Sequence, residues 1–331
     1  MKLFSEQLIF CTIFWVCVLT NGDNSFFQND TIYYEEATAR ILADFAAVSY
    51  CKNADQWDCD ICEEYPGVNA TFLNDYMLSA MIAFEPSLNK IIVAFRGTDP
   101  LSLVDWLDDF EARSVPYDLC ENCFVHHGFY KAYREIYDDI DKNLNQYHKM
   151  YPDAPLAATG HSLGAALAVL FAINISVKSP SGLGDNRLIL YTFGQPRIGN
   201  AEFADFISST LTNRCFRITH SKDPVPHVPF QLMQTNERAD FHLLESTTNY
   251  SPSEKNAMKK YKYLKSKLKY SLYQHNLVEI FYPQRRKFEK FKICSGGEDP
   301  LCSGQYSFDL LYIAHHWHYM DANFFDTTFF C

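Results

Sequence analysis

The sequence lacks an excess of basic residues, an internal repeat and, beyond its N-terminal segment, any long apolar run. Its 29 lysines and arginines face 40 aspartates and glutamates, giving a net charge of -11, which argues against nucleic acid as a general partner. A membrane helix needs about 20 consecutive apolar residues, and none follows the N-terminus. What is present, 331 residues of which 47% are hydrophobic, can bury one large α/β core or two smaller ones.

The N-terminal segment has the features of a secretory signal peptide. Lys2 provides a basic start, an apolar stretch from Leu8 to Leu19 is interrupted only by Thr12, and small and polar residues follow up to Gly22. The stretch is short for a membrane span. We therefore expect a signal peptide at residues 1–22 and a protein that is secreted or resides in the lumen of the secretory or endolysosomal pathway. An uncleaved anchor is the alternative.

The cysteine pattern agrees with an oxidising compartment. Of 11 cysteines, Cys11 and Cys17 lie in the signal segment, so nine remain, and an odd number leaves at least one thiol unpaired or intermolecular. Cys215 is the candidate free thiol, because it stands alone in an apolar strand pattern. The close pairs Cys59/Cys62 and Cys120/Cys123 suit a zinc site or disulfides, and secretion favours disulfides. Sequons begin at Asn29, Asn69, Asn174 and Asn249, and Asn174 falls within a predicted helix.

Strand and helix patterns alternate along the chain. Such alternation predicts a largely parallel sheet with helices on both faces, an α/β fold. The expected helices are 35–48, 132–147 and 203–211, and the expected strands are 81–84, 90–95, 188–193 and 214–219. A lysine-rich stretch at about 250–273 has little apolar pattern. It is interpreted as a solvated surface insertion, with a patch for anionic lipid or an unspliced intron as alternatives.

The most informative motif is Gly160-His161-Ser162-Leu163-Gly164. It follows a short apolar run and precedes an alanine-rich helical pattern, and a strand, a sharp turn and a helix are what a nucleophile elbow requires. The two glycines remove side chains where strand and helix cross. We therefore predict Ser162 as a nucleophile. The competing interpretation is a serine in an ordinary helical N-terminal turn.

A serine nucleophile needs a base and an acid that orients the base. Asp223 is the best acid, because it lies just past a predicted strand in a loop stiffened by prolines. His315, His316 and His318 are the candidate bases, and spacing alone does not separate them. The expected oxyanion donors are the amide of Leu163, which follows the nucleophile, and Thr98, which follows an earlier strand.

With these motifs assembled, the chain resembles the fungal-type, class 3 triacylglycerol lipases of the α/β-hydrolase superfamily. The matching segments run in the family's order and cover about residues 35–331, less the lysine-rich insertion. They are Phe95-Arg96-Gly97-Thr98, Val125-His126-His127-Gly128-Phe129, Thr159 to Gly164, Thr192 to Asn200, and Asp223-Pro224-Val225-Pro226-His227. The resemblance implies an α/β-hydrolase fold with a short helical lid, formed by a single domain at 23–331.

The resemblance also selects a histidine and a set of disulfides. The family's catalytic histidine stands in a His-x-x-Tyr pattern, which His316-Trp317-His318-Tyr319 matches, so His316 is predicted and His315 is the fallback. The family usually has aspartate where this chain has His315, and a further glycine where it has Ala165. The implied disulfides are Cys51–Cys331, Cys59–Cys62 and Cys294–Cys302. Proximity in sequence adds Cys120–Cys123.

A lid is implied after the oxyanion loop. Leu103, Val104 and Leu107 share a helical face, with Trp106 close to it. In the similar lipases a short helix here covers the serine, so Leu103, Trp106 and Leu107 are expected to form the lid and contact substrate. An ordinary amphipathic surface helix is the alternative.

Together these features predict a secreted serine hydrolase that cleaves carboxylic esters of lipids at a lipid–water interface, most simply triacylglycerol. It would need no metal, cofactor or obligate protein partner. One alternative is an esterase of the same fold that acts on soluble or aromatic esters such as feruloyl esters. Another is a catalytically silent lipid-binding homologue.

Overall fold

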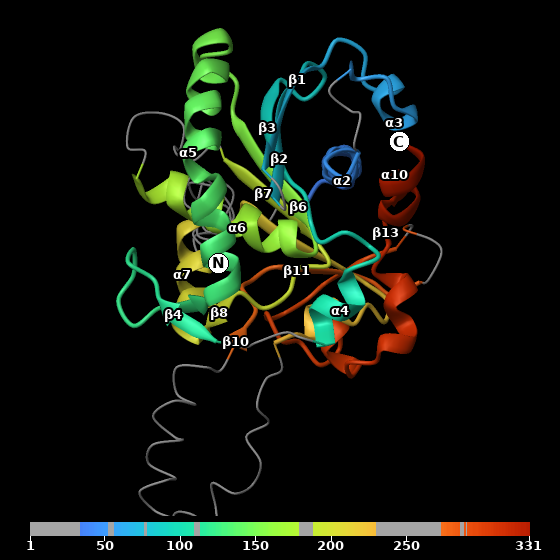
Figure 1. The fold of residues 1–331 in the computed structure, drawn as a ribbon. Helices are drawn as coiled ribbons and strands as arrows, with labels where there is room; N and C mark the ends of the chain where they lie inside the picture. The colour runs from blue at the N-terminus through green and yellow to red at the C-terminus, as the bar shows by residue number, and fades with distance from the viewer. Residues whose placement is uncertain are drawn as a thin grey trace, which may run out of the picture. The chain divides into compact units, whose positions relative to one another are not determined.

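An eight-stranded sheet organises the protein, as the computed structural model in Figure 1 shows. Its five central strands, from β3 to β11, run parallel, and the flanking strands β1, β2 and β12 are antiparallel. In spatial order the strands are β1 (Asn69–Asp75), β2 (Leu78–Glu85), β3 (Lys90–Phe95), β6 (Leu156–His161), β7 (Ile189–Phe193), β9 (Cys215–His220), β11 (Glu279–Tyr282) and β12 (Lys292–Ile293). The mostly parallel sheet confirms the predicted fold class.

The structure describes residues 34–51, 56–75, 78–108, 113–178, 188–229, 273–284, 288 and 290–331. Glu35–Cys331 form one unit. The predicted signal peptide, the sequons at Asn29 and Asn249, and nearly all of the lysine-rich insertion lie outside the described residues. Within the described ranges, no helix combines the length and the apolar character that a membrane crossing requires.

Helices cover both faces of the sheet (Figure 1). On one side lie α5 (His127–Met150), α6 (Leu163–Lys178) and α7 (Ala201–Thr210). On the other lies α2 (Glu36–Val48), with α10 (Phe324–Phe330) beside it. Helix α6 is buried from Gly164 to Ile175, because it is packed between the sheet and α5. This burial fixes the N-terminus of α6, where Leu163 follows Ser162.

Shorter elements complete the unit. A second sheet has the order β10-β8-β5-β4. In chain order, the shorter elements of the unit are α3 (Asp60–Glu63), α4 (Leu103–Asp108), β4 (Ser114–Pro116), β5 (Phe124–His126), β8 (Gly199–Asn200), the 3-10 helix η3 (Val225–His227), β10 (Tyr273–Gln274), η4 (Ser303–Gln305), η5 (Leu310–His315), β13 (His318–Tyr319) and β14 (Ala322–Asn323).

Within the described ranges the cysteines form four disulfides, Cys51–Cys331, Cys59–Cys62, Cys120–Cys123 and Cys294–Cys302, which are the four pairs expected above. Cys215 is free and buried, and burial raises the pKa of its thiol to about 12. The sequon residue Asn174 is also buried and donates a hydrogen bond to the Tyr133 hydroxyl at 2.7 Å. Asn69, in contrast, is exposed on β1.

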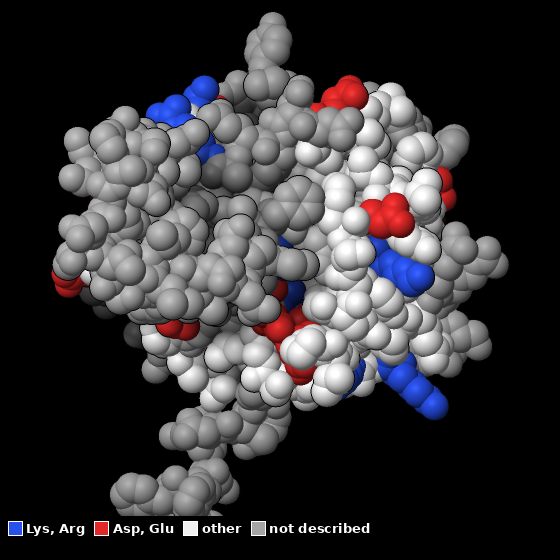
Figure 2. Space-filling model, turned by 90° about the horizontal axis from the view of Figure 1, so that it is seen from below, with Lys and Arg blue, Asp and Glu red and all other residues white. Residues whose placement is uncertain are grey.

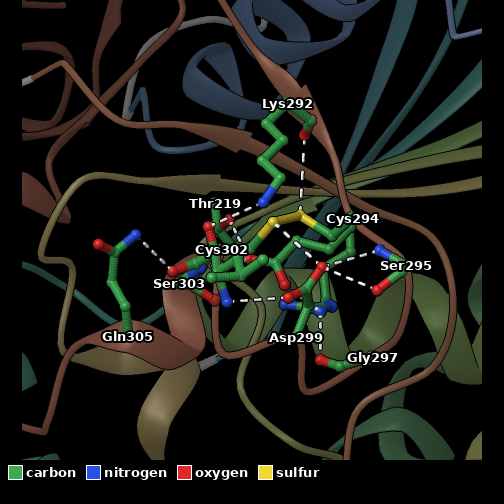
Figure 3. The surroundings of a disulfide bond; sticks show 12 residues. Thr219, Lys292, Cys294, Ser295, Gly297, Asp299, Cys302, Ser303 and Gln305 are labelled. Atoms are coloured by element: carbon green, nitrogen blue, oxygen red, sulfur yellow. Dashed lines mark hydrogen bonds and ion pairs between the residues drawn. A yellow bond between two sulfur atoms is a disulfide. The ribbon is translucent and has the colours of Figure 1, made fainter.

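A buried ion pair holds β9 to β11 near one of these disulfides. Arg217 and Glu279 lie 3.2 Å apart with both side chains fully buried. Arg217 also donates to the Gly297 carbonyl, and Glu279 accepts from the Thr219 hydroxyl and the Ser303 amide. Figure 3 shows Thr219, Gly297 and Ser303 around Cys294–Cys302. Gly297 lies in the loop that this disulfide closes and Ser303 follows it directly, so this segment supplies two of the pair's hydrogen bonds, while Arg217 Nε and Nη1 have no partner among the described residues.

Candidate active site

Ser162 lies in the turn between β6 and α6. Its φ of 59° falls in the left-handed region, which is uncommon for a residue with a side chain. The turn is held by hydrogen bonds from the Ser162 amide to the Phe193 carbonyl and from the Ala165 amide to the Ser162 carbonyl, both 3.0 Å. Strain of this kind in a buried serine is the geometry expected of a nucleophile elbow.

The glycines of the motif are required by close backbone contacts. A Cβ on Gly160 would lie 2.3 Å from the Gly164 carbonyl oxygen, and one on Gly164 would lie 2.1 Å from the Phe95 carbonyl oxygen. Both distances are far below a van der Waals contact, so strand β6, strand β3 and helix α6 cross here only because these side chains are absent. Ala165, where the family usually has glycine, is fully buried.

Asp223 and His316 form a buried pair beside this turn. Asp223 follows β9, His316 follows η5, and His316 Nδ1 lies 2.8 Å from Asp223 Oδ2. Asp223 also accepts hydrogen bonds from the Tyr319 hydroxyl and the Val225 amide. Burial by itself would raise the pKa of the Asp223 carboxyl, but the His316 charge and these hydrogen bonds bring it below its ordinary value of 3.8. The carboxylate therefore stays ionised.

Gly194 connects the pair to the serine turn. The carbonyl oxygen of its neighbour Phe193 accepts a hydrogen bond from the Ser162 amide. A Cβ on Gly194 would lie 2.8 Å from His316 Cε1 and 2.9 Å from Asp223 Oδ2. Ser162 Oγ and His316 Nε2 are both buried, and neither has a hydrogen-bond partner among the described residues. The structure thus brings together the serine, the acid and the histidine that the sequence singles out.

His315, the fallback base, is oriented differently. Its Nδ1 accepts the Lys222 amide at 3.3 Å, and its carbonyl oxygen lies 3.0 Å from His220 Nδ1. His318 is exposed, with its Nδ1 3.2 Å from the Ala314 carbonyl oxygen. Of the three clustered histidines, His316 is the one whose ring contacts Asp223.

One predicted oxyanion donor, Leu163, follows the serine in sequence, and the other, Thr98, follows the neighbouring strand of the sheet. Leu163 begins α6, so its amide belongs to the free N–H groups of a helix N-terminus. Thr98 follows β3, the neighbour of β6, and its Oγ1 is buried with no hydrogen-bond partner in the described part of the chain. Two donors in this arrangement could stabilise an oxyanion that develops next to Ser162.

The expected lid segment is the short helix α4. Leu103 and Leu107 are buried, and the partly buried Trp106 stacks on Phe129 with ring centroids 6.2 Å apart. Val104, expected on the same face, is instead 40% exposed, because it lies one residue, or 100°, around the helix from Leu103. Leu101, just before the helix, is 70% exposed.

Some residues that shape this site make contacts that the sequence does not predict. Arg197 belongs to the Thr192 to Asn200 segment, yet only the structure shows its contacts. It donates to the carbonyls of His227 and Pro229 in the loop that carries Asp223, and it pairs with Glu298 at 2.8 Å. Tyr319 belongs to the His-x-x-Tyr pattern without its contact to Asp223 being predictable. Tyr50, whose hydroxyl lies 2.9 Å from His161 Nδ1, had no sequence signal at all.

The fold and the strained serine turn are those of an α/β-hydrolase. The family model described as "Lipase (class 3)" matches residues 92–233. The chain is 33% identical to a lipase of Rhizomucor miehei over 208 residues, 61% of this chain and 54% of that protein. It is also 33% identical to the secreted mono- and diacylglycerol lipase A of Penicillium cyclopium over 178 residues, 52% of this chain and 55% of that protein. These matches support the class 3 lipase family, and the chain spans about half the length of these curated relatives.

Solved structures agree with this assignment. A triacylglycerol lipase described as having a serine-protease triad at its catalytic centre superposes with a TM-score of 0.69 at 26% identity, covering 88% of this chain and 97% of that one. A lipase from Rhizopus microsporus var. chinensis gives a TM-score of 0.67 at 25% identity, covering 88% and 90% of the two chains.

Proposed function

We propose that this protein is a serine hydrolase that cleaves carboxylic esters of lipids, most simply triacylglycerol. The observation that carries the proposal is the buried hydroxyl of Ser162, which has no hydrogen-bond partner among the residues described and lies at a strained turn beside the His316–Asp223 pair. The named lipases among its relatives support the substrate class. The exposed apolar residues Leu101 and Val104 at α4 support action at a lipid surface.

In the proposed mechanism, Ser162 Oγ attacks the ester carbonyl carbon while His316 Nε2 takes the hydroxyl proton. Asp223 holds the imidazole by its Nδ1–H and stabilises the imidazolium. The amides of Leu163 and Thr98 stabilise the oxyanion of the tetrahedral intermediate. Its collapse passes the proton from His316 to the leaving alcohol and produces an acyl-enzyme. Water then attacks the acyl-enzyme, with His316 again taking and returning a proton, to release the fatty acid.

We also propose that the protein is secreted. Four disulfides support an oxidising compartment, and relatives from Penicillium are named as secreted lipases. N-terminal sequencing of protein recovered from the medium tests this proposal. Cleavage near Gly22 is expected, and retention of residues 1–22 on a membrane would favour the anchor.

The activity is tested by hydrolysis of tributyrin below and above its solubility limit, with the wild type and Ser162→Ala. A rise in the wild-type rate when the emulsion forms, absent in the variant, is the expected result. A rate that saturates below the solubility limit would identify an esterase for soluble esters. A fluorophosphonate probe gives an independent readout, because it should modify Ser162 and lose its target in Ser162→Ala. Folded wild type that neither hydrolyses esters nor reacts with the probe would favour a silent homologue.

A further inference from the structure

His161 is a buried polar residue next to Ser162 that the proposed mechanism does not use. Its side chain is fully buried, yet both ring nitrogens have partners. Nδ1 lies 2.9 Å from the Tyr50 hydroxyl, and Nε2 lies 2.8 Å from the backbone carbonyl oxygen of His316. One ring thus connects three distant parts of the chain: the end of α2, the nucleophile turn and the turn that presents His316.

The direction of these hydrogen bonds follows from their chemistry. A carbonyl oxygen only accepts, so Nε2 of His161 must carry the hydrogen that it donates to His316. Burial, together with the charge of His316, lowers the pKa of His161 well below 6.5, so the ring is neutral and Nδ1 has a lone pair. The Tyr50 hydroxyl therefore donates to Nδ1. The two hydrogen bonds run in one direction, from Tyr50 through His161 to His316.

Packing holds each member of this chain in place. The His161 ring packs against the ring of His316, at a centroid distance of 4.2 Å, and against the nearly parallel ring of Phe324, at 3.9 Å. Tyr50 packs edge-on against Phe324 and is the residue before Cys51, which is bonded to Cys331. A Cβ on Gly97 would lie 2.0 Å from the Tyr50 hydroxyl oxygen, so Tyr50 also packs closely against the loop that leads to Thr98.

We propose that His161, supported by Tyr50, is a positioning residue that sets the distance between the His316 imidazole and the Ser162 hydroxyl. The inference rests on the proposed function. Asp223 fixes the orientation of the His316 ring, whereas His161 fixes the backbone from which that ring projects. Because His161 and Ser162 are consecutive residues, the hydrogen bond to the His316 carbonyl ties the base directly to the nucleophile turn. A displacement of about 1 Å between reacting groups can lower a rate roughly a hundredfold.

The kinetic test compares His161→Leu, His161→Gln and Tyr50→Phe in the full chain. His161→Leu removes both hydrogen bonds and should lower kcat about tenfold to a hundredfold while KM changes by less than about twofold. In His161→Gln the amide nitrogen can still donate to the His316 carbonyl, so most of the rate should return. Tyr50→Phe should have a smaller effect. The double variant Tyr50→Phe/His161→Leu should be no slower than His161→Leu alone, because the two residues act through one chain.

Thr159→Val is the matched control. Thr159 is two residues earlier on the same strand, is fully buried, and donates to the Leu42 carbonyl on α2 at 3.0 Å. Its loss removes a comparable buried hydrogen bond between β6 and α2 without touching His316. Thermal stability should fall in this variant while kcat stays within about twofold of the wild type. An equal loss of kcat in Thr159→Val and His161→Leu would overturn the positioning role.

A second readout does not depend on ester hydrolysis. In the Ser162→Ala background, the low-field proton NMR resonance of His316 Nδ1–H reports the geometry of the hydrogen bond between His316 and Asp223. It should move or broaden in His161→Leu and stay unchanged in Thr159→Val. An unchanged resonance in His161→Leu would show that His161 serves packing only, and would overturn the inference. If the wild type hydrolyses no ester, the proposed function fails, but this resonance still decides whether His161 positions His316.

Discussion

Tyr319 and His316 share one oxygen of Asp223: both the tyrosine hydroxyl and the imidazole Nδ1 contact Oδ2. Tyr319 is fully buried, and its hydrogen bond is one of the interactions that lower the pKa of Asp223. A carboxyl whose folded pKa is depressed contributes stability above its unfolded pKa and loses that contribution as the pH falls through the folded pKa.

Tyr319→Phe should therefore raise the pKa of Asp223 and lower kcat about tenfold. The part of the acid stability loss that comes from Asp223 should be smaller than in the wild type and complete at a higher pH, and the acid limb of activity should shift to higher pH. Thermal melts and kcat/KM profiles between pH 3 and 8 measure this. Tyr147→Phe, which removes a hydroxyl bonded to Thr71 and the Asn69 carbonyl, serves as the control and should leave the acid limb of activity unchanged.

Gly194→Ala should remove activity by steric displacement of the His316–Asp223 pair. The new Cβ would lie within 3 Å of both side chains, and the φ of 57° disfavours any residue with a Cβ. Tributyrin hydrolysis should fall about a hundredfold or more. Gly296→Ala is the matched control, because nothing lies within 4 Å of a Cβ there. Equal activities for the two variants would contradict this account of the site.

Arg197→Lys should loosen the loop that carries Asp223. Arg197 makes two hydrogen bonds to its carbonyls and a bidentate pair with Glu298, and a lysine ammonium cannot reproduce that fork. The free energy of unfolding should fall by roughly 2 kcal/mol, and kcat should fall about tenfold. Lys131→Met breaks the exposed pair with Glu135 and should change neither quantity. Denaturant titration and initial rates on tributyrin check both effects.

The double variant Leu101→Ser/Val104→Ser tests whether the α4 surface contacts lipid. Figure 2 views the molecule from the side on which α4 lies in Figure 1, and the described part of that face has scattered charges among uncharged residues. Loss of two exposed apolar side chains should lower the rate on emulsified tributyrin about fivefold to tenfold, while the rate on dissolved substrate stays within about twofold. Met150→Ser, at the far end of α5 and 52% exposed, should affect neither rate. An equal fall on both substrates would indicate damage to the site instead of weaker adsorption.

Asp44→Asn should stabilise the protein above pH 6. Burial, with repulsion from Glu64 and Asp321 acting in the same direction, raises the pKa of Asp44 from 3.8 to about 6 despite a hydrogen bond from Tyr65. A raised folded pKa contributes stability below the unfolded pKa, and this contribution is lost as the pH rises through the folded one. Asparagine keeps an acceptor for Tyr65 without the charge. The variant should gain about 2 to 3 kcal/mol at most between pH 6 and 8, and almost nothing at pH 3. A constant difference across this range would exclude a role for Asp44 ionisation.

Regular local patterns were enough to predict much of the sheet. The β-branched run at Lys90–Phe95 is β3 to the residue, and the strand expected at 214–219 is shifted by one residue in β9. Helix α5 begins at His127, five residues before the predicted start, because the His126 ring accepts the Phe129 amide as an N-cap. Histidine is not among the usual capping residues, so no rule would place the start there. The edge strand β1 is rich in polar residues and has no strand pattern.

The candidate site also has residues that local motifs predict and contacts that only the structure shows. Short motifs predict Ser162, the glycines on either side of it and Asp223. His316, in contrast, was selected from three clustered histidines only by resemblance to the lipases. The contact between Tyr50 and His161 joins residues 111 positions apart, and the contact between Arg197 and Glu298 joins residues 101 positions apart. Pairings of this kind depend on how the whole sheet closes, so no local pattern contains them.

The Cys51–Cys331 disulfide also orders events during biosynthesis. Its cysteines are separated by 280 residues, and at a translation rate of about 5 to 20 residues per second roughly 14 to 56 seconds pass between their additions to the growing chain. Ser162, Asp223 and His316 are all made within that interval. The neighbour of Cys51, Tyr50, is therefore anchored by the bond only after every group of the proposed triad already exists. A chain stalled before Cys331 would carry all three side chains but not this covalent anchor.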